Sequence, residues 1–322
     1  MGKRVAVQGA YPARCRAGTC VLTSEGNCLE ESFVEIHFRP LHPCLAAEVS
    51  PIDLRTVNDK AVFDRLRGGM DQYGVLVFRN QPFTDREQLD FAQRFDGQLH
   101  SKTGAAAVGR NRFGNEALSD ISNVDEAGAI RRQDDRRRIY SLANRLWHTD
   151  ASFQDPPGRY SMLSARVIPA VPADTEFADM RAAYDALDTD TKDLLEGLHV
   201  HHSIAYSRQT LGFEFDQREL DQLKGAVHEL VRTNPRTGRR SLYIASHATR
   251  IPEWPVAEGR ILLRDLMEHA TQRRFVYSHA WRPGDLVIWD NLATMHRATA
   301  FDDARHKREL RRVTTLDLPL PA

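Results

Sequence analysis

The sequence WHTD at residues 147–150 has a counterpart far downstream, where WDN at residues 289–291 is followed by His296. Alternate residues of a β-strand point to the same face, so a strand here would place His148 and Asp150 beside one metal ion. Two histidines and one carboxylate on one side of a metal form the facial triad of non-heme Fe(II) oxygenases, which leaves the opposite coordination positions open. We therefore predict His148, Asp150 and His296 as the metal ligands.

The surroundings of this pattern strengthen it. A histidine two positions before an aspartate is expected about once by chance in a chain with this many of both residues, so the pair alone is weak. The third ligand, however, lies shortly after an apolar run, LVIW at residues 286–289, which reads as a buried strand. Two strands can then face one cavity, with a ligand set between them.

Composition and charge limit the class of protein. The 322 residues are 41% hydrophobic and 27% charged, with a formal net charge of zero, so nucleic acid is not an expected partner. We find neither an apolar run long enough to span a membrane nor a signal sequence, and we expect a cytoplasmic protein without a membrane partner, with homo-oligomer formation left open. All four cysteines lie in the first 44 residues and are expected to be reduced thiols.

The order of segments predicts a mainly β protein with decorating helices. Residues 1–32 lack periodicity and read as a disordered leader, followed by a single catalytic domain over 33–322. Helices are expected over 57–72, from Thr84 onward, over 181–198 and over 258–273, and a long polar loop over 97–143 reads as a lid or a disordered segment. Short strands are expected at 75–78, 145–150, 160–168, 228–233, 241–245, 275–281, 285–290 and 311–317.

A basic cluster, RELRR at residues 308–312, runs into the last predicted strand. Arg308 and Arg312 are four positions apart, so in an extended chain they share one face while Arg311 points away. A guanidinium matches the geometry of a carboxylate, and burying it without an anion is costly. Two inward arginines would therefore bind two acids, although a solvated basic strand end is the alternative.

Several stretches together resemble the Fe(II)- and 2-oxoglutarate-dependent taurine/2,4-dichlorophenoxyacetate dioxygenase family, most closely its 2,4-dichlorophenoxyacetate branch. The resemblance implies a double-stranded β-helix, or jelly roll, with Fe(II) bound by the three predicted ligands. It covers about residues 35–318 and rests on DISNV at 120–124, LWHTDASF at 146–153, RYSMLSA at 159–165, DTEFADMRAAY at 174–184, WDN at 289–291, MHR at 295–297 and RELRR at 308–312.

Position by position, the resemblance implies further roles. Thr175 would donate a hydrogen bond to the distal carboxylate of 2-oxoglutarate and Arg308 would pair with that group, while Asn144 would line the same pocket. Arg312 would face the acid of the primary substrate, and Lys102 is a candidate for a second contact to that acid. His247 would border the substrate cavity or serve as a structural histidine, while the histidines at 199, 201 and 202 have no carboxylate at ligand spacing.

The resemblance implies a dioxygenase that uses Fe(II), 2-oxoglutarate and O2, with stimulation by ascorbate. Its substrate would be a small carboxylate, most closely an aryloxyalkanoate such as 2,4-dichlorophenoxyacetate, whose hydroxylation beside the ether oxygen releases a phenol and glyoxylate. One alternative keeps this chemistry but acts on taurine or another small sulfonate or carboxylate. A second alternative is an inactive metal-binding module or a zinc hydrolase with the same three ligands.

Overall fold

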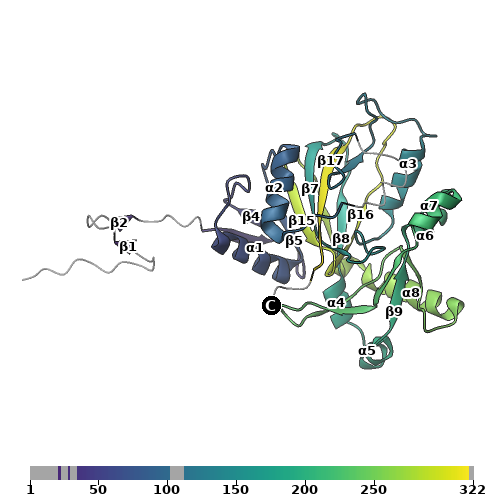
Figure 1. Ribbon diagram of the computed structural model, residues 1–322. Coiled ribbons are helices and arrows are strands. Elements are labelled where there is room, and N and C mark those ends of the chain that lie inside the picture. Colours follow the sequence, from purple (N-terminus) through teal and green to yellow (C-terminus); the bar gives the residue numbers. More distant parts are fainter. Residues whose placement is uncertain (1–20, 23–27, 30–34, 102–111, 319–322) are drawn as a thin grey trace, which may run out of the picture. The chain divides into compact units, whose positions relative to one another are not determined.

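The computed structural model describes residues 21–22, 28–29, 35–101 and 112–318 (Figure 1). Two units are distinguished, Met1–Glu35 and Ile36–Ala322. In the first, strand β1 (Val21–Leu22) pairs antiparallel with β2 (Cys28–Leu29). Most of the predicted leader over 1–32 lies outside the described residues, so that prediction stays untested.

The second unit is built on two main sheets, and its described residues form two further small sheets. Seven strands form the larger sheet, in which every neighbouring pair is antiparallel except β4 and β5. Three antiparallel strands form the smaller one. The larger sheet runs β3 (His37–Pro40), β4 (Ala47–Ser50), β5 (Val75–Phe78), β15 (Leu286–Asp290), β7 (Gly158–Val167), β17 (Glu309–Leu316) and β6 (Ser119–Ser122), and the smaller one β14 (Val276–His279), β8 (Thr175–Asp179) and β16 (Thr294–Ala298).

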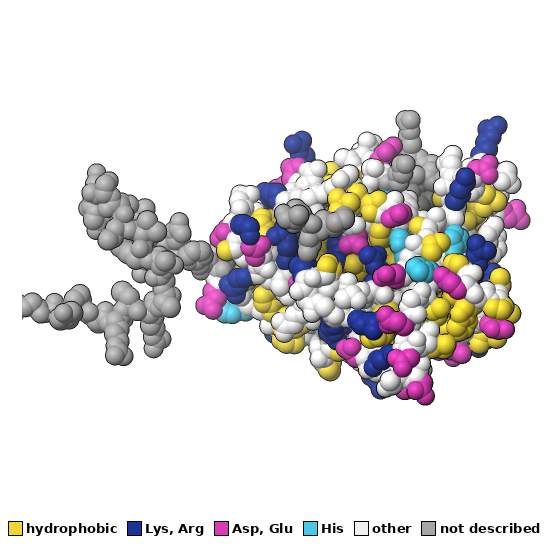
Figure 2. All heavy atoms as spheres, turned by 60° about the horizontal axis from the view of Figure 1, so that its bottom comes forward, with side chains coloured by type: hydrophobic (Ala, Val, Ile, Leu, Met, Phe, Trp, Pro, Cys, Tyr) yellow, Lys and Arg dark blue, Asp and Glu magenta, His cyan; other side chains and the backbone are white. Residues whose placement is uncertain are grey.

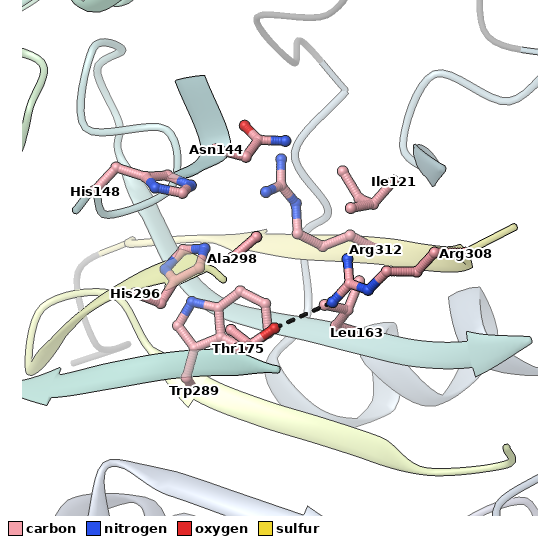
Figure 3. Close-up of a pocket in the computed structure, with 10 residues that line it drawn as sticks. All are labelled: Ile121, Asn144, His148, Leu163, Thr175, Trp289, His296, Ala298, Arg308 and Arg312. Carbon is pink, nitrogen blue, oxygen red and sulfur yellow. Dashed lines mark hydrogen bonds between the residues drawn. The ribbon is translucent and has the colours of Figure 1, made fainter. Parts of the chain in front are cut away.

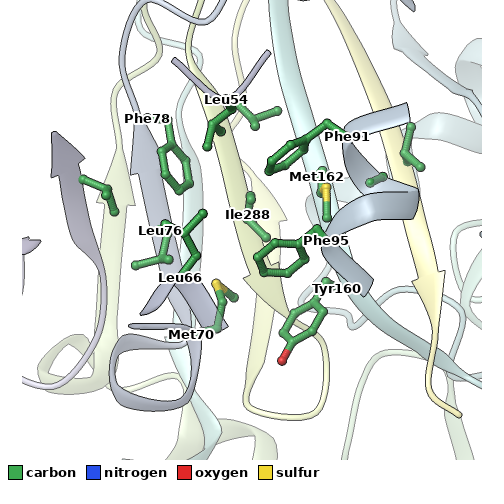
Figure 4. Close-up of a cluster of buried hydrophobic side chains, with 14 of the residues drawn as sticks. Leu54, Leu66, Met70, Leu76, Phe78, Phe91, Phe95, Tyr160, Met162 and Ile288 are labelled. Atoms are coloured by element: carbon green, nitrogen blue, oxygen red, sulfur yellow. The ribbon is translucent and has the colours of Figure 1, made fainter. Parts of the chain in front are cut away.

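Two helices cover the outer face of the larger sheet. α1 (Lys60–Tyr73) and α2 (Asp85–Asp96) pack Leu66 and Phe91 into a cluster that also contains Leu76 from β5 (Figure 4). The alternate residue Val77 belongs to a second cluster, with Phe177 of the smaller sheet. Because strand residues alternate between faces, β5 is apolar throughout, with one face toward the helices and the other toward the second sheet.

Helix α2 begins where the sequence predicts, directly after Thr84. The Thr84 hydroxyl accepts a hydrogen bond from the backbone N–H of Glu87, whose carboxylate accepts from the backbone N–H of Thr84. This reciprocal capping box satisfies two backbone donors that a helix otherwise leaves open. The predicted helix start at Thr84 is confirmed.

Smaller helices and strands surround the second sheet. α8 (Val256–Ala270) is the predicted helix over 258–273, but the single helix predicted over 181–198 is wrong, because Asp188 caps the start of a separate helix by accepting from Thr191. The remaining elements are α4 (Met180–Asp185), α5 (Thr189–Leu195), β9 (His199–His202), α6 (Ile204–Gln209), α7 (Gln217–Gln222), β10 (Ala226–Glu229), β11 (Val231–Thr233), β12 (Arg240–Leu242), β13 (Ala248–Arg250) and the 3₁₀ helix η3 (Arg273–Phe275).

Two local predictions need correction. The strand expected over 145–150 is absent, because a 3₁₀ helix, η2 (Leu142–Arg145), ends at its first residue and only a single bridge forms at His148. The loop expected over 97–143 contains β6 and a short helix, α3 (Arg136–Ser141), whose first turn is capped by Asp135. Both elements lie in a polar stretch, so the sequence did not indicate them. Their stability depends on distant partners that no local pattern reveals.

The described chain consists mostly of β sheets with some helices, 29% helical and 27% strand, which agrees with the predicted mainly β architecture with decorating helices. On the face drawn in Figure 2, Lys and Arg side chains are interspersed with Asp and Glu, as the zero net charge leads one to expect. No helix among the described residues is both long and apolar enough to cross a membrane.

Candidate metal centre and adjoining pocket

Two distant segments meet at the predicted ligands. The backbone N–H of His148 donates to the carbonyl of His296 (2.9 Å), and the N–H of His296 donates to the carbonyl of His148 (2.7 Å). Their imidazole centroids are 4.2 Å apart, and Asp150 Oδ2 lies 3.7 Å from His296 Nε2. One ligand atom from each of the three residues lies within 4.8 Å of the others, so the structure brings all three together.

Neighbouring groups orient these ligands. His148 Nδ1 donates to the carbonyl of Leu146 (2.8 Å), which leaves Nε2 as the imidazole's lone-pair donor. Ser161 Oγ donates to Asp150 Oδ2 (2.7 Å), and Asn291 Oδ1 accepts from the backbone N–H of Asp150 (3.0 Å). Asn291 therefore explains the last residue of the WDN sequence, to which the sequence alone assigned no role.

The electrostatic environment sets all three side chains in the form that binds a metal. Burial alone would raise the pKa of Asp150, but the Arg312 guanidinium and the two imidazoles lower it to about 2. Burial lowers the pKa of His148 to about 4 and holds that of His296 well below its usual value. At neutral pH the site thus presents one carboxylate and two neutral imidazoles, which metal binding requires.

A second polar group lies nearby, on β8 and just before β17. Thr175 Oγ1 accepts from Trp281 Nε1 (2.9 Å) and from Arg308 Nη2 (3.3 Å). Arg308 is buried, its pKa is lowered by burial to about 10, and its Nε has no hydrogen-bond partner. No carboxylate among the described residues forms an ion pair with it. A buried guanidinium in this state fits an anionic ligand, because such an ion would satisfy its charge.

Strand register explains why the two groups share one cavity. Phe177 pairs with His296 and Thr175 pairs with Ala298, so one face of the smaller sheet carries both the metal side and the Arg308 side. Ala298 is small and leaves room between them. The cavity in Figure 3 is lined by Ile121, Asn144, His148, Leu163, Thr175, Trp289, His296, Ala298, Arg308 and Arg312.

The other predicted site residues differ in where they lie. Asn144 lines the cavity from η2, as expected. Arg312 also lines it, but its Nη1 donates to Asp150 Oδ1, so its carboxylate partner here is a predicted metal ligand. Lys102 lies outside the described residues. His247 is buried against His148, with 5.9 Å between ring centroids.

Arg208 was missed from the sequence. It is buried in α6, donates to Asn144 Oδ1 (3.4 Å) and lies over the ring of Tyr140, with 4.7 Å from the guanidinium carbon to the ring centroid. The segment around it has no motif that differs from an ordinary helix start, and more than sixty residues separate it from Asn144. No local sequence signal could have placed it beside the cavity.

Comparisons with known proteins agree with this geometry. The family described as "Taurine catabolism dioxygenase TauD, TfdA family" matches residues 37–314. An alpha-ketoglutarate-dependent 2,4-dichlorophenoxyacetate dioxygenase of Cupriavidus pinatubonensis is 46% identical over 279 residues, covering 86% of this chain and 96% of that protein. An (S)-phenoxypropionate/alpha-ketoglutarate-dioxygenase of Sphingobium herbicidovorans is 35% identical, covering 82% and 89%.

A solved structure is also similar. The crystal structure of AAD-2 in complex with Mn(II) and N-oxalylglycine superposes with a TM-score of 0.83 at 43% identity, over 87% of this chain and 97% of that one. The predicted enzyme class, a 2-oxoglutarate-dependent dioxygenase that uses a metal ion, is confirmed. Because the match spans most of the sequence, the chain belongs to the taurine catabolism dioxygenase TauD, TfdA family.

Proposed function

We propose that the protein hydroxylates a small aryloxyalkanoate, such as 2,4-dichlorophenoxyacetate, with Fe(II), 2-oxoglutarate and O2. The observation that carries the proposal is one cavity lined by the two histidines of a His–Asp–His group and by Arg308, a buried arginine with which no carboxylate among the described residues forms an ion pair. The relatives whose names specify aryloxy acids, 46% and 35% identical, support this substrate class over taurine. The two sheets around the cavity support a double-stranded β-helix.

We propose His148, Asp150 and His296 as the Fe(II) ligands. Two neutral imidazoles and one carboxylate suit this ion, since all three come from one side and leave the remaining positions for co-substrate and oxygen. When bound, Fe(II) supplies the redox chemistry that couples O2 to oxidation of 2-oxoglutarate and of the primary substrate. Ser161 holds the Asp150 carboxylate and Asn291 holds the Asp150 backbone N–H in place for this task.

We propose that the far carboxylate of 2-oxoglutarate binds to Arg308 and Thr175. The Arg308 guanidinium has unused N–H groups, and the Thr175 hydroxyl, which already accepts two hydrogen bonds, has its own proton left to donate. N-oxalylglycine, the molecule bound in the AAD-2 structure, is also a dicarboxylate with an oxo group beside one acid, which supports such a ligand here.

The primary substrate would be held by its acid group. Arg312 and Asn144 line the cavity and are proposed to contact that acid, Asn144 in place of the 2-oxoglutarate pocket that the resemblance implied for it, with Lys102 as a further candidate. Fixing the acid places the carbon beside the ether oxygen in reach of the metal. One oxygen atom of O2 enters this carbon and the other enters succinate, with loss of CO2. The hydroxylated product is a hemiacetal, and it breaks down to a phenol and glyoxylate.

Oxygen uptake and succinate formation test the proposal. Both should require added Fe(II) and 2-oxoglutarate and should rise with 2,4-dichlorophenoxyacetate or 2-phenoxypropionate, while taurine should give little. Preference for taurine would reject the substrate class. Activity with Zn(II) alone, or no 2-oxoglutarate consumption, would favour a hydrolase or an inactive module instead.

A further inference from the structure

Arg208 has no part in the function proposed so far, yet it is a buried cation next to the cavity. Only 4% of it is exposed. Nη1 donates to Ser207 Oγ (2.9 Å), Nη2 donates to Asn144 Oδ1 (3.4 Å), and the guanidinium stacks on the ring of Tyr140. All these partners are neutral, and Nε has no hydrogen-bond partner. Within residues 35–101 and 112–318, no carboxylate forms an ion pair with Arg208.

The neutral surroundings of Arg208 are unusual for this protein. Two other buried arginines, Arg159 and Arg181, each pair with a buried aspartate, Asp290 and Asp179 respectively. Burial without such a partner is costly for a guanidinium and is seldom retained unless an anion arrives from elsewhere. Arg208, which contacts the cavity residue Asn144, thus resembles the cavity-lining Arg308, since no carboxylate among the described residues forms an ion pair with either of them.

The position of Arg208 indicates which anion it would meet. Arg308 reaches the cavity beside Thr175, whereas Arg208 reaches the cavity wall at Asn144, on a different element. Because the Asn144 side chain accepts through its oxygen, its N–H groups are left to donate to a ligand. One acid could therefore receive hydrogen bonds from Asn144 and lie against the charge of Arg208.

The charged groups at the site also indicate that Arg208 is left for the acid of the primary substrate. Arg208, Arg308 and Arg312 are three cations, and within the described part of the chain Asp150 is the one carboxylate that forms an ion pair with any of them, through Arg312. The far carboxylate of 2-oxoglutarate would neutralise the charge of Arg308. Among the three arginines, the one that then still lacks an anion is Arg208.

We propose that Arg208 is a specificity-determining residue whose charge, presented together with Asn144 and Arg312, selects a primary substrate with an acid group. This inference rests on the function proposed above and deepens it. The guanidinium lies over the ring of Tyr140, which packs against Phe213 in an apolar cluster, and apolar neighbours of this kind keep water away and strengthen the field of the charge at the cavity.

The test measures the preference for an acid over a matched neutral ligand. The wild type, the neutral variants Arg208→Met and Arg208→Gln, and the charge-retaining variant Arg208→Lys are loaded anaerobically with Fe(II) and 2-oxoglutarate. The Kd of 2,4-dichlorophenoxyacetate and of its amide is then determined from the change in the visible spectrum. Arg218→Gln, which removes an exposed arginine on α7, is the control.

The neutral variants should raise the Kd of the acid by about 10- to 100-fold, the usual worth of a hydrogen bond to a charged group. The Kd of the amide and of 2-oxoglutarate should change by less than about twofold, and Arg208→Lys should restore part of the preference. A structural role would weaken acid, amide and 2-oxoglutarate together, so the ratio of acid to amide affinity separates the two roles.

An unchanged acid-to-amide ratio in the neutral variants would overturn the inference, as would an equal loss of 2-oxoglutarate binding. Failure of both neutral variants to fold would also overturn it, since a cation kept for a ligand should be dispensable for folding. If the wild type itself did not bind 2-oxoglutarate with Fe(II), the proposed function would fail first. The two failures are therefore distinguishable.

Discussion

Strand β8 has a buried arginine near each end, and the two ends differ in how that charge is satisfied. At its last residue, Asp179 receives Arg181 Nε (3.0 Å) and Nη2 (2.9 Å) and also caps α4 by accepting from the backbone N–H of Arg181 (2.9 Å). At its first residue, Thr175 offers Arg308 only a hydroxyl at 3.3 Å. The same strand therefore carries a closed ion pair at one end and an open cation at the other.

The pKa values reflect this difference. Burial would lower the pKa of Arg181, but Asp179 more than offsets it and the pKa is raised. For Arg308 burial prevails, and the pKa falls to about 10. A buried charge with its own counter-ion is part of the scaffold, whereas one without is held ready for a ligand. The comparison thus distinguishes Arg181, whose charge Asp179 satisfies, from Arg308, which we propose binds a ligand.

The largest effect is expected at His148, a predicted metal ligand that lines the same cavity as Arg308. His148→Ala removes a metal ligand, and we expect Fe(II) affinity to fall by more than about a hundredfold, since even outer-shell partners are worth 10- to 100-fold. Oxygen uptake with 2-oxoglutarate should cease. Fe(II) titration and an oxygen electrode measure both, and His199→Ala, at an exposed histidine paired with Glu253, serves as the control. Metal-dependent uptake in His148→Ala would refute the ligand assignment.

The next largest effect is expected when the charge of Arg308 is removed. Arg308→Met should raise the Kd of 2-oxoglutarate by at least about 10- to 100-fold, because a charge-assisted pair is lost. Without 2-oxoglutarate the variant should unfold at the same or a higher temperature than the wild type, since a costly buried charge is gone. Calorimetry with and without 2-oxoglutarate measures both, and a clear loss of stability would mean that Arg308 is structural after all.

The closed pair should show the opposite pattern. Arg181→Met leaves Asp179 buried without its cation, which should lower the free energy of unfolding by about 3–5 kcal/mol. The Kd of 2-oxoglutarate, measured on the folded fraction, should be unchanged. Urea unfolding gives the first quantity and an anaerobic titration the second. If Arg181→Met mainly weakened 2-oxoglutarate binding, the two ends of β8 would not differ as described.

The smallest effect concerns Asp96, a half-buried carboxylate whose loss of solvation is only partly offset by its neighbours. Burial raises the pKa of Asp96 to about 6, although a hydrogen bond from Thr315 Oγ1 (2.7 Å) and nearby arginines oppose the shift. The folded state therefore holds this proton more tightly than the unfolded state. The resulting stability is full below about pH 4 and is lost as pH rises through about 6.

Asp96→Asn keeps an acceptor for Thr315 but cannot ionise. At pH 8 it should be more stable than the wild type by about 1–2 kcal/mol, and the gain should shrink toward pH 5. Unfolding midpoints at the two pH values measure this. A gain that is equal at both would show that ionisation of Asp96 is not the cause.

The sequence alone was a good guide wherever the decisive contacts are local. The capping box of Thr84 and Glu87 spans three residues, and the strand at 75–78 is marked by a continuous apolar run, so both were predicted within a residue or two. Strands β8 and β16 were not predicted, although they carry Thr175 and His296, because their stability comes from pairing across more than a hundred residues. The strand predicted at 145–150 failed in the opposite sense, because only His148 of this segment pairs, in a single bridge to His296.

What the sequence determined by itself was the chemistry available to the site: two histidines, one aspartate and a pair of arginines in recognisable surroundings. The tertiary structure decided which charges neutralise each other. It pairs Arg312 with Asp150, leaves Arg308 open and brings Arg208 to the cavity through Asn144. Spacing along the chain cannot specify such pairings, because they depend on the register of strands and on helices that pack from far away in the sequence.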